Sequence, residues 1–423
     1  MKALVAIFEQ LVPISGGGTP RTSHIVRALG RRGHTVSVAA SFGVALDAAK
    51  STLGCGTSPQ RSGGGCVEVL ALPFVSRLDP HKMRKYAVVY PWNVLRLALY
   101  IARTGPDLVI SHNTVAGFGA LLGEALHRRT APRGRGRTQT VLDLTDLLFE
   151  YLESYGKSRA SLVSRLGRAM ERYTIQHSDH IITISQAMRT ILVQRYGVSE
   201  SRVEVVHDGV DCEVFHPLAV PEDDLRQRVS PWARHICILH GVLDPQDGPE
   251  LLVEAAPQVL QRFPDTAFWW VGDGSAVPGI RARARELGLE ERFFFSGWVT
   301  QVEVVQYVNA SDLGLVVLPD ILSARGRVTL KEFEYWACGK AAILPRLPAL
   351  QEIIPEGRAS LFYTPGDATD LAEKIGTLLG DDPRRQAMGQ QGRQMVSERF
   401  EWRVLSDELV ALCERFCTES QED

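Results

Sequence analysis

Short runs of apolar and β-branched residues alternate with amphipathic stretches along almost the whole of this 423-residue chain. Such alternation is typical of parallel sheets that are covered by helices on both faces. The strands predicted in the first half are Lys2–Phe8, Thr35–Ala40, Val67–Leu72, Asp107–Ser111, Thr138–Asp143, His180–Ile184 and Arg202–Val206. Those predicted in the second half are His235–Leu239, Thr266–Val271, Arg292–Phe295, Leu313–Leu318, Ala341–Leu344 and Ser360–Tyr363. The chain is therefore predicted to have an α/β fold with two Rossmann-like units.

The length and the 45% apolar content are sufficient for two domains, each with its own core. The first is predicted over residues 1–214 and the second over 235–399. Between them, residues 215–234 contain three prolines and an acidic cluster, which is typical of a solvated linker. A final helix over 400–417 has leucines and a phenylalanine on one face, and we expect it to pack back on the first domain.

The charge balance and the cysteines narrow the class of protein. Forty-seven Lys and Arg against 49 Asp and Glu give a net charge of −2, which disfavours a nucleic-acid enzyme. Seven scattered cysteines without a C-x-x-C pair suggest neither a disulfide framework nor a zinc site. No export signal is evident, and the longest uncharged stretch falls short of the ~20 apolar residues of a membrane span. We expect a cytoplasmic protein, and leave its oligomeric state open.

A glycine loop follows the first predicted strand. Because Gly16, Gly17 and Gly18 lack a Cβ, their N–H groups and the start of the next helix can face a phosphate or a sugar. The spacing is not G-x-G-x-x-G, and Ala39-Ala40-Ser41 supplies no acidic residue after the second strand, so a dinucleotide site is disfavoured. A tight turn without a ligand remains an alternative.

The segment Ser178–Pro217 is the most informative part of the chain. A strand followed by serine leads through a helix to a Tyr-Gly-Val turn, and a second strand leads to His207-Asp208-Gly209-Val210-Asp211, Phe215 and Pro217. This ordered set resembles glycosyltransferase family four, the retaining enzymes of GT-B fold, and we place it nearest the exopolysaccharide-type subset. The resemblance implies two Rossmann-like domains facing a central cleft, a nucleotide diphosphate sugar donor, a hydroxyl acceptor and no cofactor.

The resemblance continues through the second domain. Val271-Gly272-Asp273-Gly274 and Phe295-Ser296-Gly297-Trp298-Val299 look like the family's turns at the nucleotide. Lys331–Lys340 resembles the donor motif K-x-x-E-Y-x-A-x-G-K. The family pattern implies that Glu334 accepts hydrogen bonds from the ribose hydroxyls. Donor-binding roles therefore fall on Gly272, Gly274, Trp298, Val299 and Glu334, together with the glycine loop at 16–18.

A second argument for the donor motif comes from the residues themselves. Thr329 and Glu332 have the T-x-x-E spacing of a capping box, which predicts a helix start beside Val328. The nearby cations are Arg325, Arg327 and Lys331. Cations and unpaired N–H groups at a helix start can hold a diphosphate as it becomes the leaving group. A capped surface helix with solvated basic residues is the alternative.

Three positions depart from the common family pattern. The usual donor-phosphate arginine and lysine fall at Val242 and Asp247, and the first glutamate of the E-x7-E motif falls at Gly326. A subset of the family has a related G-V-x-x-x-Q-x-G segment, which Gly241–Gly248 matches. We therefore assign phosphate binding to Arg325, Arg327 and Lys331 as a hypothesis, with Gly241, Val328 and Thr329 as further donor-binding residues beside them.

The acceptor side is predicted in the first domain. Pro106–His112 resembles the family's P-D-V-V-H-A-H strand end, and His112 is expected to face the cleft. Asp143–Glu150 resembles R-D-L-W-P-E with Thr145 in place of the arginine, so Asp146 and Glu150 are acceptor-binding candidates. An ordinary structural histidine, and acids that cap a helix from Leu147, remain alternatives.

The resemblance implies same-face attack, in which the leaving diphosphate helps to deprotonate the acceptor hydroxyl. We assign catalytic roles to His112, Lys331 and Glu334. No Asp-x-Asp occurs in the chain, so a metal-dependent glycosyltransferase is not indicated. Two other functions stay open: a catalytically silent nucleotide-binding scaffold, suggested by the missing family charges, and a nucleotide-sugar epimerase.

Basic residues gather in the first domain. They are Lys82, Arg84, Lys85, Arg128, Arg129, Arg133, Arg135 and Arg137. The helix predicted over Ser161–Tyr173 has an apolar stripe (Leu162, Leu166, Met170, Tyr173) and a basic one (Arg165, Arg168, Arg172). The pattern suggests peripheral contact with an anionic membrane, although a core-facing helix with a solvated outer face gives the same pattern.

Overall fold

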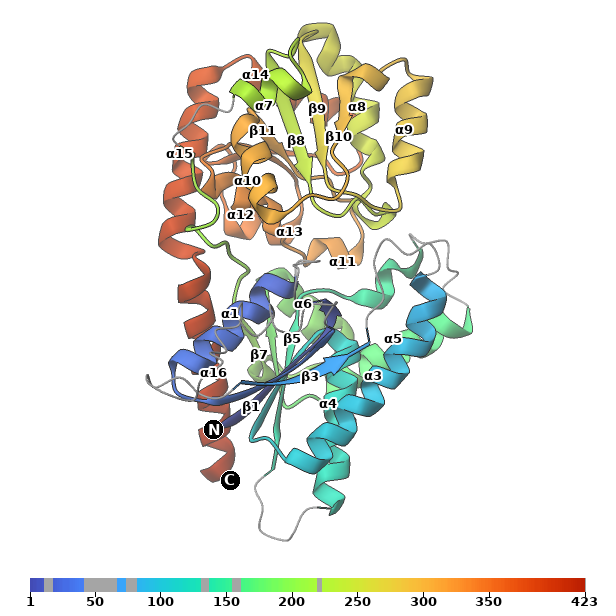
Figure 1. Ribbon diagram of the computed structural model, residues 1–423, viewed down its shortest axis with the longest axis vertical. Coiled ribbons are helices and arrows are strands. Elements are labelled where there is room, and N and C mark those ends of the chain that lie inside the picture. Colours follow the sequence, from blue (N-terminus) through green and yellow to red (C-terminus); the bar gives the residue numbers. More distant parts are fainter. Residues whose placement is uncertain are drawn as a thin grey trace. The chain divides into compact units, whose positions relative to one another are not determined.

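The computed structural model of the protein consists of two compact units. The first unit consists of Met1–His207 with Trp402–Asp423, and the second of Asp208–Glu401. The structure describes residues 1–10, 18–41, 67–73, 82–130, 137–153, 161–218 and 223–422. Figure 1 traces both units.

The first unit is a seven-stranded parallel sheet with the strand order β3-β2-β1-β4-β5-β6-β7. Its strands are β1 (Lys2–Gln10), β2 (Thr35–Ser41), β3 (Val67–Leu72), β4 (Leu108–His112), β5 (Gln139–Leu144), β6 (His180–Thr183) and β7 (Val203–Val205). Its helices are α1 (Gly18–Arg31), α3 (Lys82–Thr104), α4 (Asn113–Thr130), α5 (Leu162–His177), α6 (Gln186–Tyr196) and α16 (Trp402–Glu422), with the short 3-10 helices η1 (Leu148–Glu153) and η2 (Glu200–Arg202).

The second unit is a six-stranded parallel sheet with the order β10-β9-β8-β11-β12-β13. Its strands are β8 (His235–His240), β9 (Thr266–Val271), β10 (Phe293–Phe295), β11 (Leu313–Leu315), β12 (Ala342–Pro345) and β13 (Ser360–Tyr363). Its helices are α7 (Asp223–Val229), α8 (Glu250–Arg262), α9 (Val277–Glu286), α10 (Gln301–Ala310), α11 (Leu322–Arg325), α12 (Leu330–Ala337), α13 (Pro348–Ile353), α14 (Ala368–Leu379) and α15 (Asp382–Arg399), with the 3-10 helices η3 (Pro245–Asp247) and η4 (Glu290–Arg292).

All the predicted strands are present, and the predicted α/β class with two Rossmann-like units is confirmed. The strand predicted over Leu313–Leu318 is too long, because β11 ends at Leu315. Residues 316–318 stay buried beyond it. These loop residues are apolar because they are buried, so their sequence is like that of a strand. In so short a run, periodicity cannot distinguish a buried loop from a buried strand.

The segment predicted as a linker and the final helix each make polar contacts within one of the two units. Residues 215–234 were predicted as a linker, but they include α7, and Arg226 there donates to Ala310 O (2.8 Å) and pairs with Asp312 (3.1 Å) in the second unit. α16 packs on α1 in the first unit, where Arg31 pairs with Asp407 (2.8 Å) and Arg32 with Glu414 (2.6 Å).

The parallel arrangement brings the carboxyl ends of all strands in a unit to one edge of its sheet. In the first unit β4 lies between β1 and β5, and His112 is in register with Asp143. In the second unit β8 lies between β9 and β11 at the centre of the sheet. Ligands of open α/β sheets bind at this edge, so the residues that follow these strands form the candidate site.

Candidate functional site

Three glycine turns pack together at the carboxyl ends of β8, β9 and β10. Gly241 N donates to Val271 O (2.8 Å), and Gly272 forms a β-bridge with Gly297. Gly241 and Gly272 have φ angles of 103° and 136°, which L side chains rarely adopt. A Cβ on Gly272 would overlap Gly241 O, so the close approach of these turns requires glycine.

The neighbouring turn holds the other residues predicted for the nucleotide. A Cβ on Gly274 would overlap Leu243 O, and Ser275 N donates to Asp244 Oδ1 (2.9 Å). Trp298 is 46% exposed and Val299 is partly buried just after the β-bridge. A rigid backbone edge with an exposed indole beside it is suited to a planar base.

The start of α12 lies beside the first glycine turn. The predicted capping box is present: Thr329 N donates to Glu332 Oε1 (2.7 Å), and the Thr329 hydroxyl also donates to Glu332. A Cβ at Gly241 would lie 3.2 Å from Lys331 Cε. Val328, which precedes the cap, is buried. The structure therefore brings together Gly241, Lys331 and the amino end of a helix, an arrangement able to attract an anion.

The other two predicted cations have carboxylate partners. Arg325 pairs with Asp320 (2.6 Å) at the surface, and Arg327 pairs with Asp247 (2.8 Å). The Arg327 and Asp247 side chains are only 15% and 9% exposed, so this pair is shielded from water. An anion at the start of α12 would thus meet Lys331 more directly than either arginine.

Glu334 lies one turn along α12 from the cap and faces a histidine that sequence reasoning missed. Glu334 Oε2 is 3.2 Å from His240 Nε2, and the side chains are 14% and 5% exposed. Burial raises the pKa of Glu334 to about 8 and lowers that of His240 to about 3, the latter helped by Lys331. Both groups are therefore neutral near pH 7. His240 Nε2 makes no hydrogen bond within the part of the chain that the structure describes.

In the first unit His112 belongs to a buried charge cluster. Its Nδ1 is 3.3 Å from Asp143 Oδ2, and Asp143 pairs with Arg21 (2.8 Å). Burial alone would lower the pKa of His112, but the hydrogen bond and charge of Asp143 outweigh it and raise that pKa. Burial opposes ionisation of Asp143, yet Arg21 and His112 lower its pKa to about 2.

The ring of His112 also contacts the start of α1. A Cβ on Gly18 would overlap His112 Nε2, so glycine at this position makes room for the imidazole. The predicted Gly18 and His112 therefore lie together, whereas Gly16 and Gly17 are outside the described residues. With the His112 side chain only 3% exposed, its contact with an acceptor stays a prediction.

Asn113 was missed by sequence reasoning, although it directly follows His112. It has a φ of 61°, and its Oδ1 accepts from the N–H groups of Thr145 (3.2 Å) and Asp146 (3.3 Å). Asparagine tolerates this left-handed conformation better than most residues, which is the only local signal in the sequence. Asn113 thus holds the segment that carries the acceptor candidate Asp146.

The helix predicted from Leu147 is the 3-10 helix η1, which begins at Leu148. Glu150 on it pairs with Arg195 (3.2 Å), and its side chain is 7% exposed. Glu150 lies in the first turn of η1, as the alternative of first-turn charge expects. Asp146 and Glu150 keep their acceptor-binding roles only as predictions.

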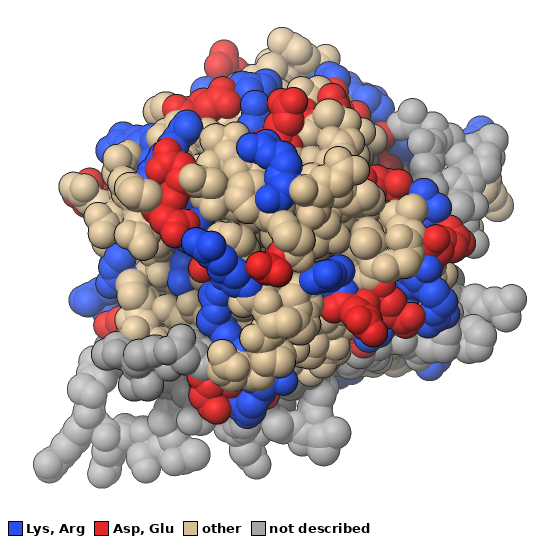
Figure 2. Space-filling view, turned by 90° about the horizontal axis from the view of Figure 1, so that it is seen from above, with Lys and Arg blue, Asp and Glu red and all other residues tan. Residues whose placement is uncertain are grey.

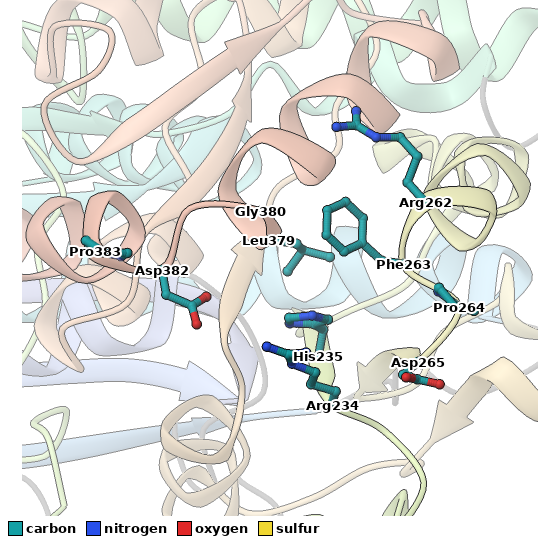
Figure 3. Close-up of a pocket in the computed structure, with 10 residues that line it drawn as sticks. All are labelled: Arg234, His235, Arg262, Phe263, Pro264, Asp265, Leu379, Gly380, Asp382 and Pro383. Atoms are coloured by element: carbon teal, nitrogen blue, oxygen red, sulfur yellow. The ribbon is translucent and has the colours of Figure 1, made fainter.

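A separate hollow of about 550 Å³ lies in the second unit, lined by Arg234, His235, Arg262, Phe263, Pro264, Asp265, Leu379, Gly380, Asp382 and Pro383. His235 begins β8, so this hollow lies at the amino ends of the strands, away from the glycine turns. Figure 3 shows His235 and Arg234 beside each other in it. None of the predicted site residues lines it.

Two family models match the chain. The model described as Glycosyltransferase Family 4 matches residues 15–214, and that described as Glycosyl transferases group 1 matches residues 234–381. Together they cover most of both units.

Named relatives are similar over part of the chain. The GDP-mannose-dependent alpha-(1-6)-phosphatidylinositol monomannoside mannosyltransferase of Mycolicibacterium smegmatis is 25% identical over 56% of this chain and 62% of its own length. The D-inositol 3-phosphate glycosyltransferase of Corynebacterium urealyticum is 27% identical over 60% of this chain and 61% of its own length. The match therefore spans less than two thirds of either relative.

Among solved structures, sucrose-phosphate synthase from Thermosynechococcus elongatus aligns with a TM-score of 0.74 at 17% identity, covering 99% of each chain. This likeness concerns the fold.

Proposed function

Because this chain belongs to glycosyltransferase family 4, we propose that it transfers a glycosyl group from a nucleotide diphosphate sugar to an acceptor hydroxyl, with retention at the anomeric carbon. The product would be a glycan, a glycolipid or a glycosylated metabolite. The predicted family is confirmed, and so is the GT-B fold. Membership of the exopolysaccharide-type subset stays a prediction.

One observation carries the proposal: Lys331 and the amino end of α12 meet the glycine turn at Gly241. A nucleotide diphosphate has its negative charge on the diphosphate, and that charge grows as the bond from the anomeric carbon to the diphosphate oxygen breaks. A cation and helix N–H groups fixed beside it stabilise the leaving group without reorganisation. The turns at Gly272, Gly274, Trp298 and Val299 lie on the same edge of the sheet and are proposed to hold the nucleoside.

Glu334 supports the same assignment. Its carboxyl group is mostly buried, with a pKa raised to about 8 by burial, and its Oε2 lies 3.2 Å from His240 Nε2. A neutral carboxyl group can both accept a hydrogen bond from a ribose hydroxyl and donate one. We therefore propose that Glu334 binds the ribose, and we add the neighbouring His240 to the donor site.

In the proposed reaction the acceptor oxygen attacks the anomeric carbon on the face that the diphosphate leaves. The new carbon–oxygen bond forms as the bond to the diphosphate breaks, and the acceptor proton passes to a diphosphate oxygen. The protein positions the two substrates and stabilises the leaving group. His112 is proposed to contact the reacting sugar or acceptor, and Asp146 and Glu150 to bind the acceptor. No cofactor is part of the proposal.

The proposed function includes a location in the cell. We propose that the protein works in the cytoplasm with peripheral contact to an anionic membrane, as the basic residues of the first unit suggest.

Thermal unfolding with UDP, GDP, ADP and dTDP tests the donor site. A ligand that binds only the folded protein stabilises it, by about 2.7 kcal/mol at 100 times its Kd. We expect one nucleotide to raise the melting temperature and Lys331→Ala to weaken its binding by about 10-fold or more, since a charge-assisted contact is worth about 1.5–3 kcal/mol. Arg358→Ala is the control, because Arg358 is exposed and precedes β13 at the opposite edge of the sheet. If Lys331→Ala binds nucleotide as tightly as the parent, the phosphate assignment is wrong.

A catalytically silent nucleotide-binding scaffold is the second candidate. The observation that favours it is the pairing of Arg327 with Asp247, because a paired Arg327 is less able to bind the phosphates as predicted. Slow release of free nucleotide from a nucleotide sugar would support the enzyme. Binding without any turnover would support the scaffold.

A further inference from the structure

Large apolar side chains are exposed on one layer of helices in the first unit. Nine of the fifteen strongly exposed large hydrophobic residues among the described residues lie on α3, α4 and α5. They are Val88 (72%), Trp92 (54%), Leu95 (44%), Leu99 (40%), Leu122 (37%), Leu162 (69%), Val163 (61%), Leu166 (62%) and Tyr173 (46%). The apolar stripe predicted on α5 is thus largely exposed rather than core-facing. We call the outward side of these three helices the α3–α5 face.

These residues form one surface because the helices are packed together. α4 lies against both α3 and α5. A Cβ on Gly123 of α4 would lie 2.7 Å from Ile101 Cβ of α3, so these two helices approach closely. On the other side, the rings of Phe118 and Tyr173 are 6.0 Å apart. Along α3 the exposed residues from Val88 to Leu99 recur at intervals of four, three and four, which places them on one side of that helix.

The three helices that carry this face are rich in basic residues. The sequences of the three helices contain ten Lys and Arg residues and two glutamates. Both glutamates, Glu124 and Glu171, are buried, so no carboxylate of these helices is exposed. On the face of the molecule in Figure 2, by contrast, Lys and Arg are interspersed with Asp and Glu. The whole chain has a net charge of only −2, so the excess of cations is local.

We propose that the α3–α5 face docks on an anionic phospholipid bilayer, with the leucines, Val163 and Trp92 in the headgroup region and Arg165 and its neighbours on the lipid phosphates. Apolar residues flanked by cations are the composition of helices that lie in a membrane interface. Among the described helices none has the length and apolarity to cross a bilayer. This proposal deepens the membrane contact put forward above by naming its surface.

Charge decides between a bilayer and a second copy of the chain. Two copies meeting through the α3–α5 face would bring two strongly basic surfaces together without an exposed carboxylate from these helices to neutralise them. Like charges at close range are destabilising, whereas anionic headgroups supply the missing negative charge.

The position of the most exposed residues relates the face to the candidate site of the same unit. α3 and α5 end just before β4 and β6 begin, so their amino-terminal halves lie toward the carboxyl edge of the sheet. Val88, Leu162 and Leu166 are in those halves, and β4 ends at His112 on that edge. The docking surface therefore extends to the side of the unit that carries the acceptor candidates.

Vesicle flotation tests the proposal on the full chain without nucleotide. The protein should float with vesicles of phosphatidylcholine and phosphatidylglycerol, less with phosphatidylcholine alone, and less at high salt. Leu166→Asp should lower the partition coefficient about 10-fold or more, and Arg165→Glu about fivefold or more. The matched controls are Val302→Asp and Arg358→Glu in the second unit, where Val302 is 67% exposed. Both should float like the parent.

Three results would overturn the proposal. The first is a parent protein that stays in solution with anionic vesicles at low salt. The second is a Leu166→Asp variant that floats as well as the parent while keeping the parent's melting temperature. The third is a dimer in sedimentation that Leu166→Asp abolishes, which would assign the face to a second copy. Nucleotide binding is measured separately, so failure here leaves the proposed donor site untouched.

Discussion

At the scale of single residues, the pair of Arg21 and Asp143 links several elements of the first unit. The side chains are 0% and 1% exposed, and Arg21 also donates to Val206 O (3.1 Å) and His207 O (3.0 Å). The pair thus connects α1 and β5 to the chain just after β7, and Asp143 in turn holds His112. Removing one member would leave the other charge buried without its partner.

Asp143→Ala should therefore lower the free energy of unfolding by about 3–5 kcal/mol. Asp407→Ala is the matched control, because Asp407 pairs with Arg31 at the surface and both side chains are 39% exposed. Breaking such a pair costs about 0–1 kcal/mol. Urea denaturation of both variants measures the difference. Equal losses in the two variants would contradict the account of the buried cluster.

The sequence predicts the donor residues better than their charge partners. Lys331 and Gly241 could be named from motif and capping-box spacing, and the structure brings them together. The pairing of Arg327 with Asp247 could not be predicted, because the two residues are 80 positions apart and local patterns carry no such contact. Asp143 at the end of an apolar strand was a usable signal, since a buried carboxylate needs a partner.

At the scale of elements, η1 is held against α5 by two contacts. A Cβ on Gly167 of α5 would overlap the ring of Phe149, so the absence of a side chain there lets η1 approach. Phe149 N donates to Glu171 Oε2 (3.3 Å), and Tyr196 OH donates to Glu171 Oε1 (3.1 Å). The position of the acceptor candidate Glu150 on η1 thus depends on α5.

Gly167→Ala should destabilise the fold by about 1–3 kcal/mol, because the methyl group displaces Phe149 from a packed position. Gly30→Ala in α1 is the control, because a Cβ there has no neighbour within 4 Å. Alanine is a better helix former than glycine, so this control should be stabilised by up to about 1 kcal/mol. Denaturant titration compares them, and a neutral Gly167→Ala would contradict the packing of η1.

The buried carboxyl group of Glu171 predicts how the stability of the fold changes with pH. Burial raises the pKa of the Glu171 carboxyl group to about 7 from the ordinary value of 4.5. As pH rises between these values, the unfolded chain loses the proton while the folded chain keeps it, so the parent loses stability. Glu171→Gln cannot ionise, so its stability relative to the parent should increase by about 3 kcal/mol across this range, at about 1.4 kcal/mol per pH unit. A difference that does not change with pH would contradict the burial of this carboxyl group.

Elements were predicted well where burial and spacing agree. The strands could be found because each is a short apolar run, and most ends were placed within a residue or two. The α5 stripe could not be interpreted from the sequence, because a core-facing helix and a helix with an exposed apolar face have the same periodicity. Only the exposure of Leu162 and Leu166 separates these interpretations.

At the scale of the whole molecule, the chain passes between the two units twice. It leaves the first unit after His207 and returns at Trp402, so α16 completes a unit that began at Met1. The proposed donor residues all lie in the second unit except Gly16, Gly17 and Gly18, and the proposed acceptor residues lie in the first. The two halves of the reaction are therefore expected to respond to different substitutions.

His112→Ala should separate them. Nucleotide binding, measured by thermal unfolding, should stay close to that of the parent, because the residues proposed to hold the nucleotide, apart from the glycine loop at 16–18, are in the other unit. Turnover should fall by about 10²–10⁴-fold if His112 contacts the reacting groups. Equal turnover in parent and variant would remove His112 from the reaction and leave it a structural partner of Asp143.

The anomeric configuration of the product is the most direct test of the central claim. The donor is a nucleotide sugar with the base that thermal unfolding identifies. Proton NMR of the reaction mixture then follows the anomeric signals of the donor and the product. We predict release of nucleoside diphosphate and a product with the donor's anomeric configuration. Inversion, interconversion of two nucleotide sugars, or binding without consumption of the donor would contradict the account.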